Sequence, residues 1–214
     1  MEKAGTYNGQ SVIEEWFNSL SHGIGAILAI LGTMALINIA MQTGNIINVV
    51  SMSLYGASMI VLYTNSTLYH ATTNFKVKRV LQILDHCSIF LLIWGTYVPV
   101  ALLLISGTAG WVIFGVQTFC AIAGIVLNAI DMKKFKKFSL VLYVVMGWSI
   151  VINLQALFNV IDIVGGFLLV AGGLAYTIGI LFYIKKDKMF YHFIWHLFVV
   201  AGSLFHYMFV IRFC

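Results

Sequence analysis

Three of the six histidines in this chain have a spacing that suits a metal site. His192 and His196 lie four residues apart in the apolar run YHFIWHLFVV, so in a helix both side chains project from one face. His70 ends the motif STLYH in a different apolar stretch. Two imidazoles from one helix and a third from another form the ligand set of an open tetrahedral zinc site, in which water takes the fourth position. Zinc bound in this way makes hydroxide available at neutral pH.

Two further side chains could take part in such chemistry. Asp85 could accept a hydrogen bond from a metal-bound water or act as a general base, and burial beside a dication would keep it ionised. Ser66, one helical turn before His70, could donate to a substrate oxygen or orient a ligand. An H-x-x-x-H pair is a weak motif by itself, and H-E-x-x-H is absent because Ile194 and Trp195 fill the middle of HFIWH.

The composition is that of an integral membrane protein. The 214 residues are 61% hydrophobic and 9% charged, whereas soluble domains are about 45–50% apolar and about 25% charged. The net charge of +5 is explained by membrane topology and contact with anionic lipid headgroups, and the basic face with aromatic platforms of a nucleic-acid-binding domain is missing. The three cysteines form no C-x-x-C pair, which favours buried or free thiols. Glutamates precede the first long apolar run, so we expect no signal peptide.

Seven segments are long and apolar enough to cross a bilayer core, which takes roughly 20 residues as a helix. They are residues 22–41, 46–68, 81–105, 108–130, 138–157, 160–184 and 190–212. The sequence therefore predicts an all-α fold, a seven-transmembrane helical bundle spanning residues 22–214. Asp162 is expected to cap the start of the sixth span.

The basic residues predict the orientation of this bundle. With seven spans, every Lys and Arg except Arg212 lies on the same side as the N-terminus. These residues are Lys3, Lys76, Lys78, Arg79, Lys133, Lys134, Lys136, Lys137, Lys185, Lys186 and Lys188. Basic loops stay on the cytoplasmic side, so we expect a plasma-membrane protein with its N-terminus in the cytoplasm and its C-terminus outside.

A separate N-terminal region is predicted over residues 1–21. Within SVIEEWFNSL, the apolar residues Ile13, Trp16, Phe17 and Leu20 follow the spacing i, i+3, i+4 and i+7. This pattern is typical of a short amphipathic helix that lies in the membrane interface.

The predicted topology brings the polar residues to one depth. The STLYH motif closes the second span on the cytoplasmic side, Asp85 lies one to two turns into the third, and His192 and His196 begin the last. His206 is about 15 Å further along the last span, and we expect it to make a structural hydrogen bond. Ionisable residues inside a membrane are costly and usually mark a site. The alternative is a hydrogen-bonded polar cluster that holds the helices together.

Four blocks of the chain resemble the signature blocks of a known family. EEWFNSLSHGIGA, STLYH, LDHCSIFLLIWGTYVPV and HFIWHLFVVAGSLFH are similar to those of the hemolysin III group, the bacterial branch of the progestin-and-adipoQ-receptor family. The resemblance covers about Glu14 to His206. In that family, and in the wider superfamily that includes alkaline ceramidases, zinc sits among the helices near the cytoplasmic face.

The resemblance implies roles for particular residues. The zinc ligands would be His70, His192 and His196, with Asp85 in contact with zinc-bound water and Ser66 beside it. The N-terminal block of the family has an acidic residue, an asparagine and a histidine, which fall on Glu15, Asn18 and His22. These residues would support the metal site or gate its mouth. The alternative is a role in interfacial capping and helix packing. His86 is expected to support the site or to bond a backbone carbonyl.

Three functions are compatible with these features. The first is a zinc-dependent hydrolase of a lipid amide or ester bond, similar to a ceramidase, with membrane lipids as partners and a lipid substrate inside the bundle. The second is a non-enzymatic regulator or sensor of membrane lipids with structural zinc. A pore-forming hemolysin is less well supported, because no span has a sustained polar stripe. The sequence leaves the oligomeric state open.

Overall fold

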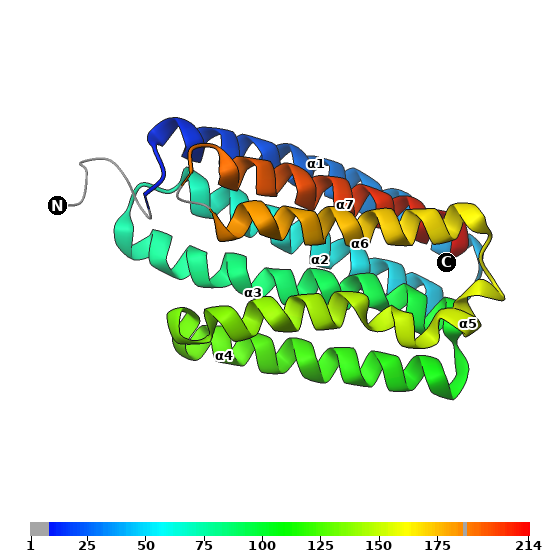
Figure 1. The fold of residues 1–214 in the computed structure, drawn as a ribbon. Helices are drawn as coiled ribbons and strands as arrows, with labels where there is room; N and C mark the ends of the chain where they lie inside the picture. Colours follow the sequence, from blue (N-terminus) through cyan, green and yellow to red (C-terminus); the bar gives the residue numbers. More distant parts are fainter. Residues whose placement is uncertain (1–8, 186–187) are drawn as a thin grey trace.

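The computed structural model describes residues 9–185 and 188–214, which form an elongated bundle of helices (Figure 1). Lys3 and Lys186, two of the residues used to predict the orientation, lie outside the described residues. The helices are α1 (Val12–Gln42), α2 (Ile46–Ala71), α3 (Phe75–Pro99), α4 (Gly107–Trp148), α5 (Leu154–Phe158), α6 (Ile163–Ile184) and α7 (Tyr191–Phe213). A π-helical segment, Val100–Ile105, follows α3, and a 3-10 segment, η2 (Ser149–Asn153), follows α4.

The predicted amphipathic segment and the first predicted span form a single helix, α1. Its start is fixed by a capping box, in which Ser11 Oγ accepts from the backbone N–H of Glu14 and Glu14 accepts from the backbone N–H of Ser11. The helix then continues to Gln42 without a break at the expected boundary between residues 21 and 22. The apolar stripe that includes Trp16, 73% exposed, faces outward, and its position in a membrane interface stays a prediction.

Helix α4 reverses its direction at Asp131. The backbone there is not helical, with φ −157° and ψ 90°. Gln117 Nε2 donates to Met146 O across 3.1 Å, although residues 29 apart in a straight helix would be separated by about 43 Å. The chain therefore folds back, so that a first limb (107–130) lies beside a second limb (132–148) (Figure 1). Asp131 Oδ1 accepts from the backbone N–H groups of residues 133 and 134 and so caps the second limb.

Within residues 9–185 and 188–214, six helical stretches are long and apolar enough to cross a membrane, and the longest, Gly107–Phe158, contains the reversal at Asp131. Many of their large apolar side chains face outward, as expected where lipid replaces water as the solvent. The predicted all-α membrane fold is confirmed at this level.

Close contacts between neighbouring helices hold one side of the bundle together. Helix α2 packs between α1 and α3, and α7 packs against α1 and α6. A Cβ added at Gly56 would lie 2.3 Å from Thr33 Cγ2, so only glycine permits this approach of α1 to α2. Helix α6, by contrast, makes few contacts with α4.

The C-terminus lies at the far end of the bundle (Figure 1). This end has its own polar contacts. Asp162 caps α6 as predicted, because its Oδ1 accepts from Gly165 N at 2.9 Å. Its Oδ2 accepts from Arg212 of α7 at 2.8 Å. The Gly165 hydrogen bond, and then that from Arg212, lower the pKa of the exposed Asp162 carboxyl.

Candidate metal centre

Three histidine side chains from two helices converge at the end of the bundle where α1 begins. His70 lies at the end of α2, and His192 and His196 lie in the first two turns of α7. The Nε2 atom of His192 is 3.3 Å from Nε2 of His70 and 3.2 Å from Nε2 of His196. All three residues are buried. The structure thus brings together the three histidines that the sequence selected as metal ligands.

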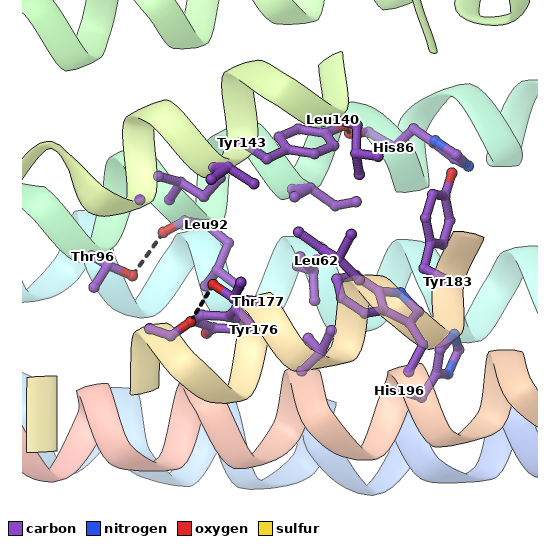
Figure 2. A pocket seen from close by; sticks show the side chains of 18 of the residues that line it. Leu62, His86, Leu92, Thr96, Leu140, Tyr143, Tyr176, Thr177, Tyr183 and His196 are labelled. Carbon is purple, nitrogen blue, oxygen red and sulfur yellow. Dashed lines mark hydrogen bonds between the residues drawn. The ribbon is translucent and has the colours of Figure 1, made fainter. Parts of the chain in front are cut away.

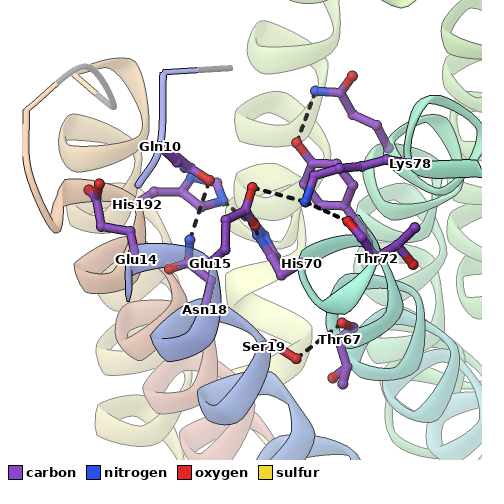
Figure 3. Close-up of polar contacts among 12 residues, drawn as sticks. Gln10, Glu14, Glu15, Asn18, Ser19, Thr67, His70, Thr72, Lys78 and His192 are labelled. Carbon is purple, nitrogen blue, oxygen red and sulfur yellow. Dashed lines mark hydrogen bonds and ion pairs between the residues drawn. The ribbon is translucent and has the colours of Figure 1, made fainter. Parts of the chain in front are cut away.

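A carboxylate fixes the ring of His70 (Figure 3). Glu15 Oε2 lies 2.6 Å from His70 Nδ1, and the Lys78 ammonium lies 2.9 Å from Glu15 Oε1. The nearby cation favours the ionised carboxylate, which can only accept hydrogen bonds. The Nδ1 atom of His70 must then be the donor, so its Nε2 keeps a lone pair.

The backbone fixes the ring of His196 in the same way. Its Nδ1 lies 3.2 Å from the carbonyl oxygen of Asn18, which can only accept. Ser21 Oγ, 3.3 Å from the same nitrogen, donates its own hydrogen to that carbonyl and can accept from the ring. His196 therefore also has its hydrogen on Nδ1 and a lone pair on Nε2.

This arrangement fits a cation. The lone pairs of His70 and His196 both lie against His192 Nε2, and a neutral ring has at most one hydrogen to offer there. Two ligands held about 2.0–2.1 Å from zinc at tetrahedral angles are themselves about 3.3–3.4 Å apart, close to the spacings observed here. Carboxylate and carbonyl partners on the other ring nitrogen are usual for metal-binding histidines. The donor set and its supports therefore suit a zinc ion.

Helix α1 supplies a wall of this site. The resemblance implied that three residues of α1 support the site or gate its mouth, and all three lie beside the histidines: Glu15, Asn18 and His22. The His22 ring stacks on that of His196, with centroids 3.7 Å apart, and meets Tyr63 edge-on.

Two contributors were missed from the sequence. Glu14 was assigned to no site, yet its Oε1 accepts from Phe190 N at 2.7 Å. Phe190 has a φ of 62°, which is unusual for a bulky residue, and it lies immediately before α7 and two residues before His192. The capping-box spacing from Ser11 to Glu14 was the available signal for Glu14. Lys78 is buried and bonded to Glu15, whereas the sequence indicates only that it is one of the basic loop residues that orient the bundle.

An elongated cavity extends from the histidines into the bundle (Figure 2). Asp85 and Ser66 line it together with His22, His192 and His196, so the residues expected to do chemistry share one space. The rest of the wall is largely apolar and comes from α2, α3, the second limb of α4, α6 and α7. It thus borders the region where α4 and α6 barely touch.

The remaining two histidines are separate from the group of three. The ring of His86 lines the cavity near Tyr183, while its backbone oxygen accepts from Tyr143 Oη at 2.8 Å. His206 donates from Nε2 to Leu169 O at 3.4 Å, the structural hydrogen bond expected from its depth.

A family model described as Haemolysin-III related matches residues 10–207. This chain belongs to the haemolysin-III related family. Hemolysin-3 of Bacillus cereus is 41% identical over 91% of this chain and 89% of its own length. The Hemolysin-3 homolog of Bacillus subtilis (strain 168) is 38% identical over 95% and 96%. The human Monocyte to macrophage differentiation factor is 28% identical over 72% and 66%, and it supports the expected link to the progestin-and-adipoQ-receptor family.

We expect Glu15→Gln to weaken zinc binding by this haemolysin-III related protein by about 10- to 100-fold, because an amide supports the His70 Nδ1–H less well than a carboxylate. Competition with a zinc chelator measures the affinity. Asp162→Asn, at the far end of the bundle, is the matched carboxylate control. Equal zinc affinity in Glu15→Gln, Asp162→Asn and the unmodified protein would contradict the role of Glu15.

Proposed function

We propose that this protein is a zinc-dependent hydrolase that cleaves an amide or ester bond of a membrane lipid. The observation that supports this most is the convergence of three imidazole nitrogens at the end of an apolar cavity that also contains Asp85 and Ser66. A site that holds only water needs no long apolar wall, whereas a site that holds a lipid tail does.

His70, His192 and His196 would hold the zinc ion, which supplies a Lewis acid and a hydroxide at neutral pH. Asp85 would accept the proton of the attacking water and return it to the leaving group. Ser66 would donate a hydrogen bond to the substrate oxygen or to Asp85, which lines the same cavity. Glu15 and the Asn18 carbonyl would keep two ligand rings in the tautomer that binds metal.

The lipid would enter from the side. The cavity lies between the second limb of α4 and α6, which make few contacts with each other. A membrane lipid could place its tail there without leaving the bilayer, with the bond to be cleaved at the histidine end.

A regulator or sensor with structural zinc is the second candidate. It is favoured by the bonds from α1 to His70 of α2 and to His196 of α7, because a metal in this site would tie three helices together. A pore-forming role has no comparable support, since the cavity wall is largely apolar rather than polar.

We also propose that the chain crosses the membrane seven times, with its N-terminus in the cytoplasm. The reversal at Asp131 divides α4 into two limbs, and the second continues through α5 to Phe158. The described basic residues, apart from Arg212, lie at the histidine end of the bundle or in the α4 turn at that end (Figure 1). This bias supports a cytoplasmic position for the candidate metal centre.

We expect about one zinc per purified chain, lost in both His70→Ala and the double variant His192→Ala/His196→Ala, because two of three ligands cannot retain the ion. Elemental analysis of detergent-purified protein measures the metal. His206→Ala, a buried histidine away from the group of three, should keep it. Well-folded protein without metal after zinc supplementation would rule out the proposed chemistry.

We expect Asp85→Asn to reduce lipid hydrolysis at least 100-fold while zinc content stays unchanged, since general acid–base groups contribute about 10²–10⁴-fold. Product release from ceramide and phospholipid vesicles, followed by mass spectrometry, measures the activity. His86→Gln, on the same cavity wall, should lose much less. If the unmodified protein holds zinc but hydrolyses none of these lipids, the structural-zinc alternative is favoured.

The topology can be tested by labelling single cysteines in a chain from which the three native cysteines have been removed. We expect Asn159→Cys to react with a membrane-impermeant maleimide on intact cells and Lys134→Cys to react only after permeabilisation. Asn159 lies in a turn, and Lys134 lies just after the reversal at Asp131. Labelling of the two on the same side of the membrane would therefore contradict seven crossings.

A further inference from the structure

The ring of His22 lies flat against the ring of His196, one of the three candidate zinc ligands. The two ring centroids are 3.7 Å apart, and the ring planes differ by 15°. Glu15, Asn18 and His22 have the spacing i, i+3 and i+7, so they lie on one face of α1. Glu15 and the Asn18 carbonyl contact the site through hydrogen bonds, whereas His22 contacts it through the face of its ring.

The ring nitrogens of His22 contribute nothing comparable. Within residues 9–185 and 188–214, neither Nδ1 nor Nε2 of His22 has a hydrogen-bonding partner, although the residue is only 3% exposed. The ligand atoms that converge on one another belong to His70, His192 and His196, so His22 is not a fourth member of that set. A buried charge without a partner is costly, which favours the neutral form of the ring.

A second ring, that of Tyr63 in α2, also packs against His22. It meets the His22 ring edge-on, with centroids 5.1 Å apart and an angle of 90° between the planes. Tyr63 is itself fixed, because its Oη donates to Ser203 Oγ at 2.8 Å. Its ring also packs closely on Gly25, where an added Cβ would lie 2.7 Å from the Tyr63 Cδ1 atom. Tyr63, His22 and His196 thus form a series of ring contacts between α2, α1 and α7.

The contact between His22 and His196 is closer and more nearly parallel than aromatic rings usually prefer. The face of such a ring carries negative charge density, so offset or edge-on pairs with centroids about 4.5–7 Å apart are favoured. A cation on the Nε2 lone pair of His196 would draw electron density from that ring. The face of a neutral His22 would then attract it, as aromatic faces attract positive charge. The stack therefore suits a metal-bound His196 better than a metal-free one.

The stack and the hydrogen bond of His196 restrict different motions of its ring. The bond from Nδ1 to the Asn18 carbonyl fixes the direction in which that nitrogen points. It leaves the ring able to tilt about the axis of the bond. The parallel ring of His22 limits this tilt, so the two contacts together fix where Nε2 lies.

We propose that His22 is a positioning residue for the metal, and that it acts through the face of its ring. The ring holds the plane of His196 in the orientation that directs Nε2 toward the other two histidines, and the nitrogens of His22 take no part. This inference rests on the metal-binding part of the proposed function and is independent of whether the protein hydrolyses a lipid.

Two substitutions separate the ring of His22 from its nitrogens. His22→Phe keeps a ring and removes both nitrogens, whereas His22→Asn keeps a donor and an acceptor and removes the ring. Groups that orient metal-binding histidines typically change metal affinity by about 10- to 100-fold. We therefore expect His22→Asn to weaken zinc binding at least about tenfold, and His22→Phe to remain within about threefold of the unmodified full-length protein. Competition with a zinc chelator measures both affinities.

Cobalt(II) provides a readout that a general loss of packing would not change. In protein loaded with cobalt in place of zinc, the ligand-field absorption depends on the directions of the ligands. We expect the spectrum of His22→Phe to match that of the unmodified protein and the bands of His22→Asn to shift. His206→Asn is the matched control, because His206 lines the same cavity but lies outside the stack, and it should leave affinity and spectrum unchanged. Melting of the metal-free proteins shows whether each variant folds, and His22→Leu replaces His22→Asn if the latter does not.

The outcomes distinguish this inference from its alternatives. An equal loss of zinc affinity in His22→Phe and His22→Asn would assign the role to the nitrogens and overturn the inference. Unchanged affinity and an unchanged cobalt spectrum in His22→Asn would overturn it as well. Zinc binding that depends on the ring, in a protein that hydrolyses no lipid, supports the inference and contradicts the hydrolase. An unmodified protein that binds neither metal would contradict both.

Discussion

Buried imidazoles in a membrane protein need partners, and this requirement organises the end of the bundle where α1 begins. Each ring of the candidate metal centre is buried, and its second nitrogen needs a hydrogen-bonding partner. Glu15 serves His70, and the Asn18 carbonyl serves His196. An unsatisfied buried polar group costs about 1–3 kcal/mol, so α1 must lie against α2 and α7 here. The same contacts leave two Nε2 lone pairs facing one another, an arrangement that a cation would stabilise.

Charged side chains link the start of α3 to the candidate metal centre. Lys78 pairs with Glu15, donates to Thr72 O at 3.2 Å and lies over the Tyr69 ring. Glu14 meanwhile holds the strained backbone of Phe190 at the start of α7. Backbone strain of this kind persists only where the surroundings impose it, and it is often found at functional sites. The position of His192 therefore depends on α1 as well as on its own helix.

The other side of the bundle is built differently. The second limb of α4 is held to α3 by the Tyr97 hydroxyl and to α6 by the Trp148 indole, with little side-chain packing between α4 and α6. The Trp148 indole thus bridges two helices that make few contacts with each other, and it lines the cavity that they border. The compact half thus provides the metal centre, while the loose half provides room for an apolar ligand.

Several features of this protein were determined by the sequence alone. Hydropathy and helical spacing predicted an all-α membrane protein, the pairing of His192 with His196, and the cap at Asp162, because each depends on residues near in sequence. Common depth within the helices selected His70 as the third histidine, and the resemblance to the hemolysin III group implied that Glu15, Asn18 and His22 lie near the site. The residues from Val12 onward continue into the first span as one helix, since no proline follows the capping box within α1.

Only the tertiary structure decided the rest. The bonds of Glu15 to His70 and of Lys78 to Glu15, and the tautomers that follow, depend on distances between side chains of different helices. Helical periodicity gives the face and depth of a residue, but the rotation and separation of helices are fixed by how their surfaces pack together.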